Sequence, residues 1–239
     1  MSLRFLYNAP AIYHKKALII GDTHFGIESK LLAKGIYVQN FSDNLFEKIK
    51  SLIHQTKAEK LIILGDVKER ITALDSKSAD ILARLSLLAE LIIVRGNHDG
   101  GIEGCGAKII SSKGFVHGKL GMVHGHSWPS AEVMEADYLI SAHQHPQLSV
   151  VDRSGSRHVE PVWIMADPEP ENISAKYTDF NEKIKLVLMP AFNPLVGATF
   201  NAQDSRLGPI LSNNLFKINA ATIYRLDGTS IGKLGSLQK

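Results

Sequence analysis

The sequence predicts an α/β fold in which two β-sheets pack together and helices flank them. Three observations support this prediction. Short apolar runs alternate with helical patterns in the first half of the chain, and the second half contains extended runs separated by turns. Hydrophobic residues make up 44% of the 239 residues, which is enough for a sizeable core. We expect a single domain over residues 1–239.

Five short apolar runs predict buried strands. They are rich in β-branched residues and too short for typical helices, and glycine or polar residues follow them. The runs are ALII at 17–20, LIIL at 61–64, LIIV at 91–94, GMV at 121–123 and YLI at 138–140.

Two segments between these runs predict helices. Apolar residues recur with helical spacing in residues 42–56, behind an N-cap at Ser42 or Asp43, and again in residues 76–90. Strands that alternate with helices predict a largely parallel sheet in the first half. Residues 28–40 have no clear pattern and are expected to form a connection.

The second half of the chain has a different pattern. From about residue 147, the runs LSVV, HVEPVWIM, IKLVLM and ATIYRL are separated by turn signals such as DRSGS and LDGTS. We expect mostly antiparallel strands here and no long helix. The acidic, proline-broken residues 166–172 predict a surface loop.

Charge and cysteine content narrow the class of protein. A net charge of +3 permits attraction to phosphates but lacks the dense basic stripe of a dedicated nucleic-acid binder. The single cysteine, Cys105, excludes an internal disulfide and fits a reducing compartment. No stretch approaches the roughly 18 apolar residues of a membrane span. We expect a soluble cytoplasmic protein that does not act at a membrane.

Each of the five predicted strands is followed by residue types that bind metals. Since the carboxyl ends of strands in an open α/β sheet border a common crevice, these residues are expected to converge. In chain order they are Asp22 and His24; Asp66; Asn97, His98 and Asp99; His124 and His126; and His143 and His145.

The ligand types narrow the choice of ion. Imidazoles, carboxylates and an amide oxygen, without thiolate, suit Mn, Fe, Zn, Co or Ni. The many imidazoles disfavour a site for Mg alone. Seven candidate ligands among these residues exceed the needs of one tetrahedral ion. Two ions roughly 3.5 to 4 Å apart, bridged by a carboxylate, would use them all.

The ordered set D-x-H, G-D, G-N-H-D, H-G-H and H-x-H, over residues 22–145, resembles the calcineurin-like metallophosphoesterase superfamily. Within it, ALIIGDTHFGIE and LMPAFNPLVGA resemble the archaeal and bacterial ICC-like phosphoesterases, which are related to DNA-repair nuclease subunits. The resemblance implies the metallophosphoesterase-type sandwich of two sheets flanked by helices.

The resemblance also implies a role for each matching residue. It assigns seven metal ligands to two sets that share a bridging carboxylate. The sets are Asp22, His24 and His145, and Asn97, His124 and His143, with Asp66 as the bridge.

The other implied residues lie around these ligands. His98 would be the general acid, held by Asp99, because a carboxylate on one ring nitrogen fixes the tautomer of an imidazole. His126 is a candidate substrate contact. Arg70 is a candidate phosphate contact.

The chain departs from the superfamily pattern at two places. Ala142 stands where the last motif usually has glycine, with Gln144 between the histidines, and we expect Ala142 to shape the pocket. After Asp66 the chain reads VKER where the protein phosphatase branch has D-R-G, which weakens a phosphoprotein phosphatase reading. Lys30 and Lys34 are also available to contact phosphate.

The implied function is a phosphoesterase with two divalent ions. Mn is the first expectation, with Fe, Zn or Ni as alternatives. A metal-bridging hydroxide would attack a phosphodiester of a nucleic acid, such as DNA, or of a nucleotide, with His98 as the acid. The alternatives are a small-molecule or cyclic-nucleotide phosphodiesterase, a phosphatase, and a non-catalytic scaffold of the same fold.

Overall fold

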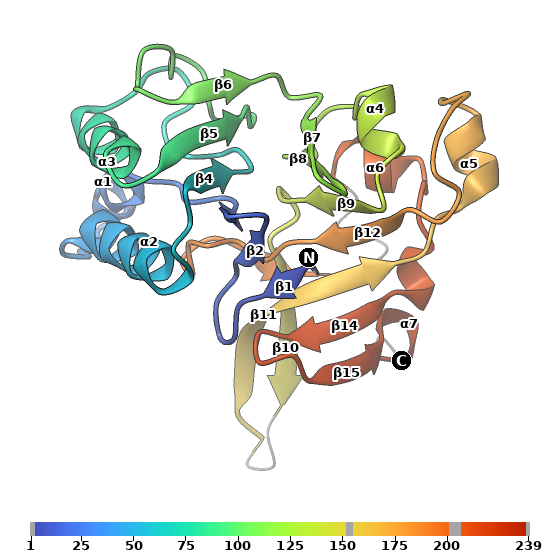
Figure 1. The fold of residues 1–239 in the computed structure, drawn as a ribbon. Coiled ribbons are helices and arrows are strands. Elements are labelled where there is room, and N and C mark those ends of the chain that lie inside the picture. The colour runs from blue at the N-terminus through green and yellow to red at the C-terminus, as the bar shows by residue number, and fades with distance from the viewer. Residues whose placement is uncertain (1–2, 152–154, 201–206, 238–239) are drawn as a thin grey trace.

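The computed structural model describes residues 3–151, 155–200 and 207–237. Two sheets face each other, and helices lie against their outer faces (Figure 1). This arrangement confirms the predicted fold class. Among the described residues, no helix is long and apolar enough to cross a membrane.

The first sheet contains the first three predicted strands. From β3 to β6 neighbouring strands pair in parallel, as expected, while β1 and β2 add an antiparallel edge. In spatial order the strands are β1 (Arg4–Phe5), β2 (Ile12–His14), β3 (Ala17–Ile20), β4 (Lys60–Ile63), β5 (Glu90–Val94) and β6 (Lys108–Ile110).

The second sheet joins both halves of the chain. The predicted antiparallel pairing holds for β10 with β11 and for β11 with β12 and β14. However, β12 pairs in parallel with β9, because the chain crosses over before it enters β12. The main order is β13 (Ala198–Thr199), β10 (Pro146–Val151), β11 (Arg157–Ala166), β12 (Lys185–Leu188), β9 (Tyr138–Ser141), β8 (Leu120–Val123) and β7 (Phe115–His117); β14 (Thr222–Arg225) pairs with β11 and with β15 (Ser230–Lys233).

The helices differ from the expectations mainly at their ends. Residues 28–40, expected to form a connection, include all of α1 except its first residue, and the expected loop over residues 166–172 runs into α5. The helices on the first sheet's side are α1 (Ile27–Ala33), α2 (Phe41–Thr56) and α3 (Ser76–Ser86). The others are α4 (Ala131–Met134), α5 (Pro170–Ser174), α6 (Gly208–Ser212), the 3₁₀ turn η1 (Ile218–Ala220) and α7 (Leu234–Leu237).

The predicted N-cap of α2 is wrong. Asn40 occupies the cap position with a left-handed backbone and no capping side-chain hydrogen bond. Ser42 lies inside the helix, where its hydroxyl accepts from the Gly26 amide at 3.0 Å and donates to Glu28 at 2.6 Å. The other oxygen of Glu28 accepts from the Ser42 amide at 2.6 Å. A residue of α1 therefore satisfies the start of α2 and ties the two helices together.

Alternating side chains of the first sheet face two different layers. Leu18 and Ile20 pack toward α2 and α3, whereas Ile19 faces the second sheet. The layer between the sheets also contains Ile140 and Val187 from the second sheet. Because this layer joins both halves of the chain, it supports the single domain, which stays a prediction.

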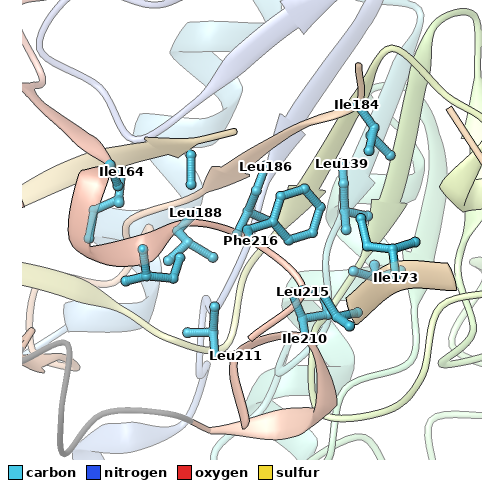
Figure 2. Packing of buried hydrophobic residues seen from close by; sticks show 14 of the residues in the cluster. Leu139, Ile164, Ile173, Ile184, Leu186, Leu188, Ile210, Leu211, Leu215 and Phe216 are labelled. Atoms are coloured by element: carbon cyan, nitrogen blue, oxygen red, sulfur yellow. The ribbon is translucent and has the colours of Figure 1, made fainter. Parts of the chain in front are cut away.

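A third layer covers the outer face of the second sheet. Figure 2 shows Phe216 beside Leu186 of β12, with Leu215 and Ile210 nearby. All four are at most 2% exposed. The three packed layers hold both sheets rigidly, so the loops at their strand ends occupy fixed positions.

Candidate metal centre

The predicted ligands converge after the carboxyl ends of β3, β4, β5, β8 and β9. Among the described residues, three groups have ligand atoms that all lie within 4.8 Å of one another, and two of these groups consist of predicted ligands; the third is His24, Glu69 and His98. Of the two groups of predicted ligands, the first is Asp22, His24, Asp66 and His145, and the second is Asp66, His124 and His143. These two groups share Asp66, the residue expected to bridge.

The first group is centred on the buried carboxylate of Asp22. Its Oδ1 lies 3.1 Å from Nε2 of His145, and its Oδ2 accepts from the backbone amide of His143 at 3.1 Å. Burial alone would raise the pKa of Asp22, but His145, His124 and His24 together lower it. Asp22 is therefore an ionised oxygen donor.

The second group is centred on His124, which is fully buried. Its Nδ1 donates to the Leu64 carbonyl at 2.8 Å, and its Nε2 lies 3.0 Å from Oδ1 of Asn97. The ring centroid of His143 lies 4.7 Å from that of His124. Burial, together with His124, lowers the pKa of His143 to about 4, which leaves a neutral imidazole able to bind a cation.

Asp66 lies between the two groups and contacts both. Its Oδ2 is 3.7 Å from Nε2 of His24, and its Oδ1 is 3.5 Å from Nε2 of His124. The two oxygens of one carboxylate thus face histidines from different strands. This is the geometry that a bridging ligand requires.

Most of the proposed ligands occupy strained backbone positions. A non-glycine residue rarely adopts a positive φ, and each instance costs about 1 to 3 kcal/mol. The values are 55° for Asp22, 43° for His24, 49° for Asp66, 67° for His143 and 43° for His145. Such strain clusters at functional sites, where the surrounding structure enforces it.

Two observations test whether these residues fit divalent metal ions. Nε2 of His24 and Nδ1 of His143 are buried and have no hydrogen-bond partner among the described residues. Buried polar atoms normally have a hydrogen-bond partner, so these two nitrogens are available to bind a metal ion. The donors are imidazoles and carboxylates with an amide oxygen nearby, which suits borderline divalent ions. The residues therefore fit the metals that the sequence predicts.

His98 lies beside the first group but is oriented differently from the prediction. Its ring centroid is 5.1 Å from that of His24, and its Nδ1 lies 2.9 Å from the carbonyl oxygen of Glu69. A carbonyl only accepts, so Nδ1 carries the proton in this contact. The expected pairing of His98 with the Asp99 carboxylate is wrong.

Asp99 instead organises the loops around the ligands. It is fully buried, and its carboxylate accepts from the backbone amides of Gly96 at 2.7 Å, Asp66 at 2.8 Å and Val67 at 2.9 Å. Burial raises the pKa of Asp99, and the nearby Asp66 adds to the rise while the Gly96 amide opposes it. Its carboxylate points into the loops because those amides need acceptors.

Glu69 is a residue of the site that sequence reasoning missed. Its Oε2 lies 2.9 Å from Nδ1 of His24, and its other oxygen accepts from Lys30. Burial would raise the pKa of Glu69, but hydrogen bonds with His24 and Lys30 lower it to about 2. Lys30, expected to be available for phosphate, is therefore engaged. The position of Glu69, three residues after Asp66 in the same loop, was the available signal.

The candidate substrate contacts lie in different environments. His126 is half-buried, with its ring centroid 5.2 Å from that of His124, and its Nδ1 has no hydrogen-bond partner among the described residues. It therefore borders the second group. Arg70 is exposed, and its carbonyl accepts from the Lys68 amine. Its role as a phosphate contact stays a prediction.

Ala142 and Gln144 make contacts with the core and with the chain before α6. Ala142 is buried in the layer between the sheets, where a Cβ on Gly21 would approach it to 2.8 Å. Its expected role in shaping the pocket is wrong, because its methyl group packs into the core. Gln144 donates to the Leu207 carbonyl at 2.6 Å.

Comparison with known proteins supports the same assignment. Residues 15–131 match the family model of the calcineurin-like phosphoesterases. No curated protein matches the chain. The match confirms the resemblance seen in the motifs and the expected enzyme class, a metal-dependent phosphoesterase.

Two solved structures are similar to this chain. The nuclease MPE of Pseudomonas putida is 19% identical, with a TM-score of 0.58 over 91% of this chain and 89% of that one. YfcE, a phosphoesterase from E. coli, is 15% identical, with a TM-score of 0.45 over 91% of this chain and 97% of that one. The first of these likenesses shows the two-sheet fold.

Proposed function

We propose that this chain, a calcineurin-like phosphoesterase over residues 15–131, hydrolyses phosphodiesters of nucleic acids or nucleotides with two divalent metal ions. The observation that carries the proposal is the position of Asp66, whose two oxygens face His24 and His124. A carboxylate shared by two sets of ligands is what a dinuclear centre requires.

The proposed ligands divide as the motifs predict. Asp22, His24 and His145 would hold one ion, and Asn97, His124 and His143 the other, with Asp66 common to both. When bound, the ions would supply Lewis acidity to the phosphate and to the attacking water. Mn is the first ion to test, since the donors suit Mn, Fe, Zn and Ni alike.

His98 would transfer a proton to the leaving oxygen. Its Nδ1 is held on the Glu69 carbonyl, so Nε2 is the nitrogen that exchanges a proton. Its backbone amide donates to Oδ1 of Asp66 at 2.9 Å, which places this residue directly beside the proposed bridge. A positioned acid typically contributes about 10² to 10⁴ in rate.

A phosphodiester substrate fits this division of labour. The leaving alkoxide of a natural diester is a strong base and depends on an acid, whereas an aryl leaving group depends on it less. The nuclease activity in the name of the Pseudomonas putida structure makes DNA the first polymer to test. The presence of His98 as an acid on the loop after β5 supports hydrolysis of diesters over hydrolysis of aryl monoesters.

The test compares two aryl substrates after the protein is stripped of metal and supplied with Mn. We expect turnover of bis(p-nitrophenyl) phosphate to exceed that of p-nitrophenyl phosphate, and Asp66→Asn to abolish both. Asp137→Asn, an exposed carboxylate paired with Lys119, is the matched control and should leave turnover unchanged. Preference for the monoester would make the protein a phosphatase. Absence of Mn-dependent turnover of either substrate would favour a scaffold.

A further inference from the structure

Lys68 is a lysine whose side chain is completely buried beside the candidate metal centre. Its amine donates to the carbonyl oxygen of His98 at 2.6 Å, to that of Ile71 at 3.0 Å and to that of Arg70. Three acceptors occupy all three N–H groups of a charged lysine ammonium. A buried charge is costly unless it is compensated. The three carbonyl contacts provide that compensation for the Lys68 ammonium.

These carbonyls belong to the two loops that follow β4 and β5. The same loops are joined by the Asp99 carboxylate, which accepts from the amides of Asp66 and Val67. They also approach each other closely, because a Cβ on Gly100 would lie 2.6 Å from the carbonyl oxygen of Ile71. The two loops therefore form one unit with the Lys68 ammonium inside it.

His98 is fixed within this unit at three points. Its amide donates to Asp66 at 2.9 Å, its ring Nδ1 contacts the Glu69 carbonyl at 2.9 Å, and its own carbonyl accepts from Lys68. Asp66 is a proposed metal ligand, and the Glu69 contact uses the backbone. Lys68 is thus a side chain whose replacement removes a restraint on His98 without removing a proposed ligand.

We propose that Lys68 is a positioning residue for His98, the proton donor, and that it acts by clamping the loops after β4 and β5 through three backbone carbonyls. This inference rests on the proposed function of His98. Lys68 has no contact with the substrate in this role. Replacing Lys68 should therefore reduce kcat most for the substrates whose leaving group depends most on an acid.

The test uses Lys68→Met, which keeps the volume of the side chain and removes all three donors. A dinucleotide with an alkoxide leaving group should lose about 10- to 100-fold in kcat, because misplacing a catalytic group by about 1 Å costs up to about 10². Bis(p-nitrophenyl) phosphate, with its weakly basic leaving group, should change by less than about threefold. Bound Mn should be unchanged. Lys119→Met, an exposed lysine paired with Asp137, is the matched control.

A double variant separates positioning from general damage. In a His98→Asn background, Lys68→Met should cause no further loss with the dinucleotide, since the group that it positions is already gone. Additive losses, or equal losses with both substrates, would overturn the proposal. If Lys68→Met does not fold, Lys68→Gln retains two of the donors and should show the same selective loss at smaller size.

A readout without catalysis keeps the proposal separate from the proposed function. Hydrogen exchange of metal-free protein should speed up in Lys68→Met at residues 66–71 and 96–100 together, and not in Lys119→Met. Unchanged exchange in both loops would overturn the clamp. If the wild-type protein cleaves neither diester, the proposed function fails, and the exchange result alone decides whether Lys68 holds these loops.

Discussion

Nδ1 of His24 and Oε2 of Glu69 lie 2.9 Å apart, which links the loop after β3 to the loop after β4. The contact fixes the tautomer of His24 so that its other nitrogen, Nε2, faces Asp66. Glu69 is in turn held by Lys30 of α1. Helix α1, which the sequence did not predict, thereby supports His24, a proposed ligand that the sequence did predict.

Glu69→Gln should weaken metal binding without unfolding the protein. The amide keeps the shape of the side chain but loses the charge that orients His24, and loss of such a partner typically costs 10- to 100-fold in metal affinity. Calorimetric titration with Mn measures the effect. Glu47→Gln, on the exposed face of α2, is the control. Equal affinity in wild type and Glu69→Gln would contradict the orienting role.

Asp99→Asn should destabilise the loops around the site. One carboxylate oxygen that accepts from the amides of Gly96 and Asp66 would be lost or replaced by an amide donor, and each unsatisfied buried group costs about 1 to 3 kcal/mol. Urea unfolding measures the loss. The exposed Asp80→Asn on α3 should change stability by less than about 0.5 kcal/mol. Wild-type stability in Asp99→Asn would contradict the role of this carboxylate as the acceptor for the loop amides.

His98→Asn should spare metal binding and remove most diesterase activity. A missing acid lowers kcat by about 10² to 10⁴ for an alkoxide leaving group. Metal content and turnover of a dinucleotide are measured on the same sample, with His54→Asn on α2 as the control. Parallel loss of metal and activity would make His98 part of the metal site.

The protein should lose stability above pH 10 partly through Tyr177. Burial raises the pKa of its hydroxyl from the ordinary 10.0 to about 12, and the hydroxyl donates to the Pro129 carbonyl at 2.8 Å. Because the folded pKa exceeds the unfolded one, this contribution is complete below pH 10 and disappears as the pH rises to about 12.

Unfolding experiments across this pH range test the prediction. The decline in stability should be shallower in Tyr177→Phe than in wild type. Tyr37→Phe is the control, because Tyr37 is 75% exposed, and it should follow the wild-type curve. Identical slopes for wild type and Tyr177→Phe would show that this hydroxyl does not titrate differently in the folded state.

The strands and the polar residues at their ends were predictable because both depend on local sequence. Short β-branched runs followed by Asp, Asn or His can be recognised without knowing how the strands pack together. Helix α1 was missed because Ile27 is its one buried residue, which leaves no amphipathic pattern to detect.

Contacts between loops could not be predicted in the same way. Asp99 follows His98 directly, so a pair seemed natural, yet its carboxylate is taken up by amides of the loop after β4. The partner of His24 lies 45 residues away in Glu69. Such pairings depend on how β3, β4 and β5 bring their following loops together, which no local pattern specifies.

The number of ions held per chain distinguishes a shared dinuclear centre from a single metal site. Metal-stripped protein is dialysed against Mn and its bound metal is quantified. We expect two ions for wild type, about one for His145→Ala, and loss of both for Asp66→Asn, because Asp66 is common to the two groups of predicted ligands. A single ion in wild type, or loss of only one in Asp66→Asn, would contradict the shared dinuclear centre.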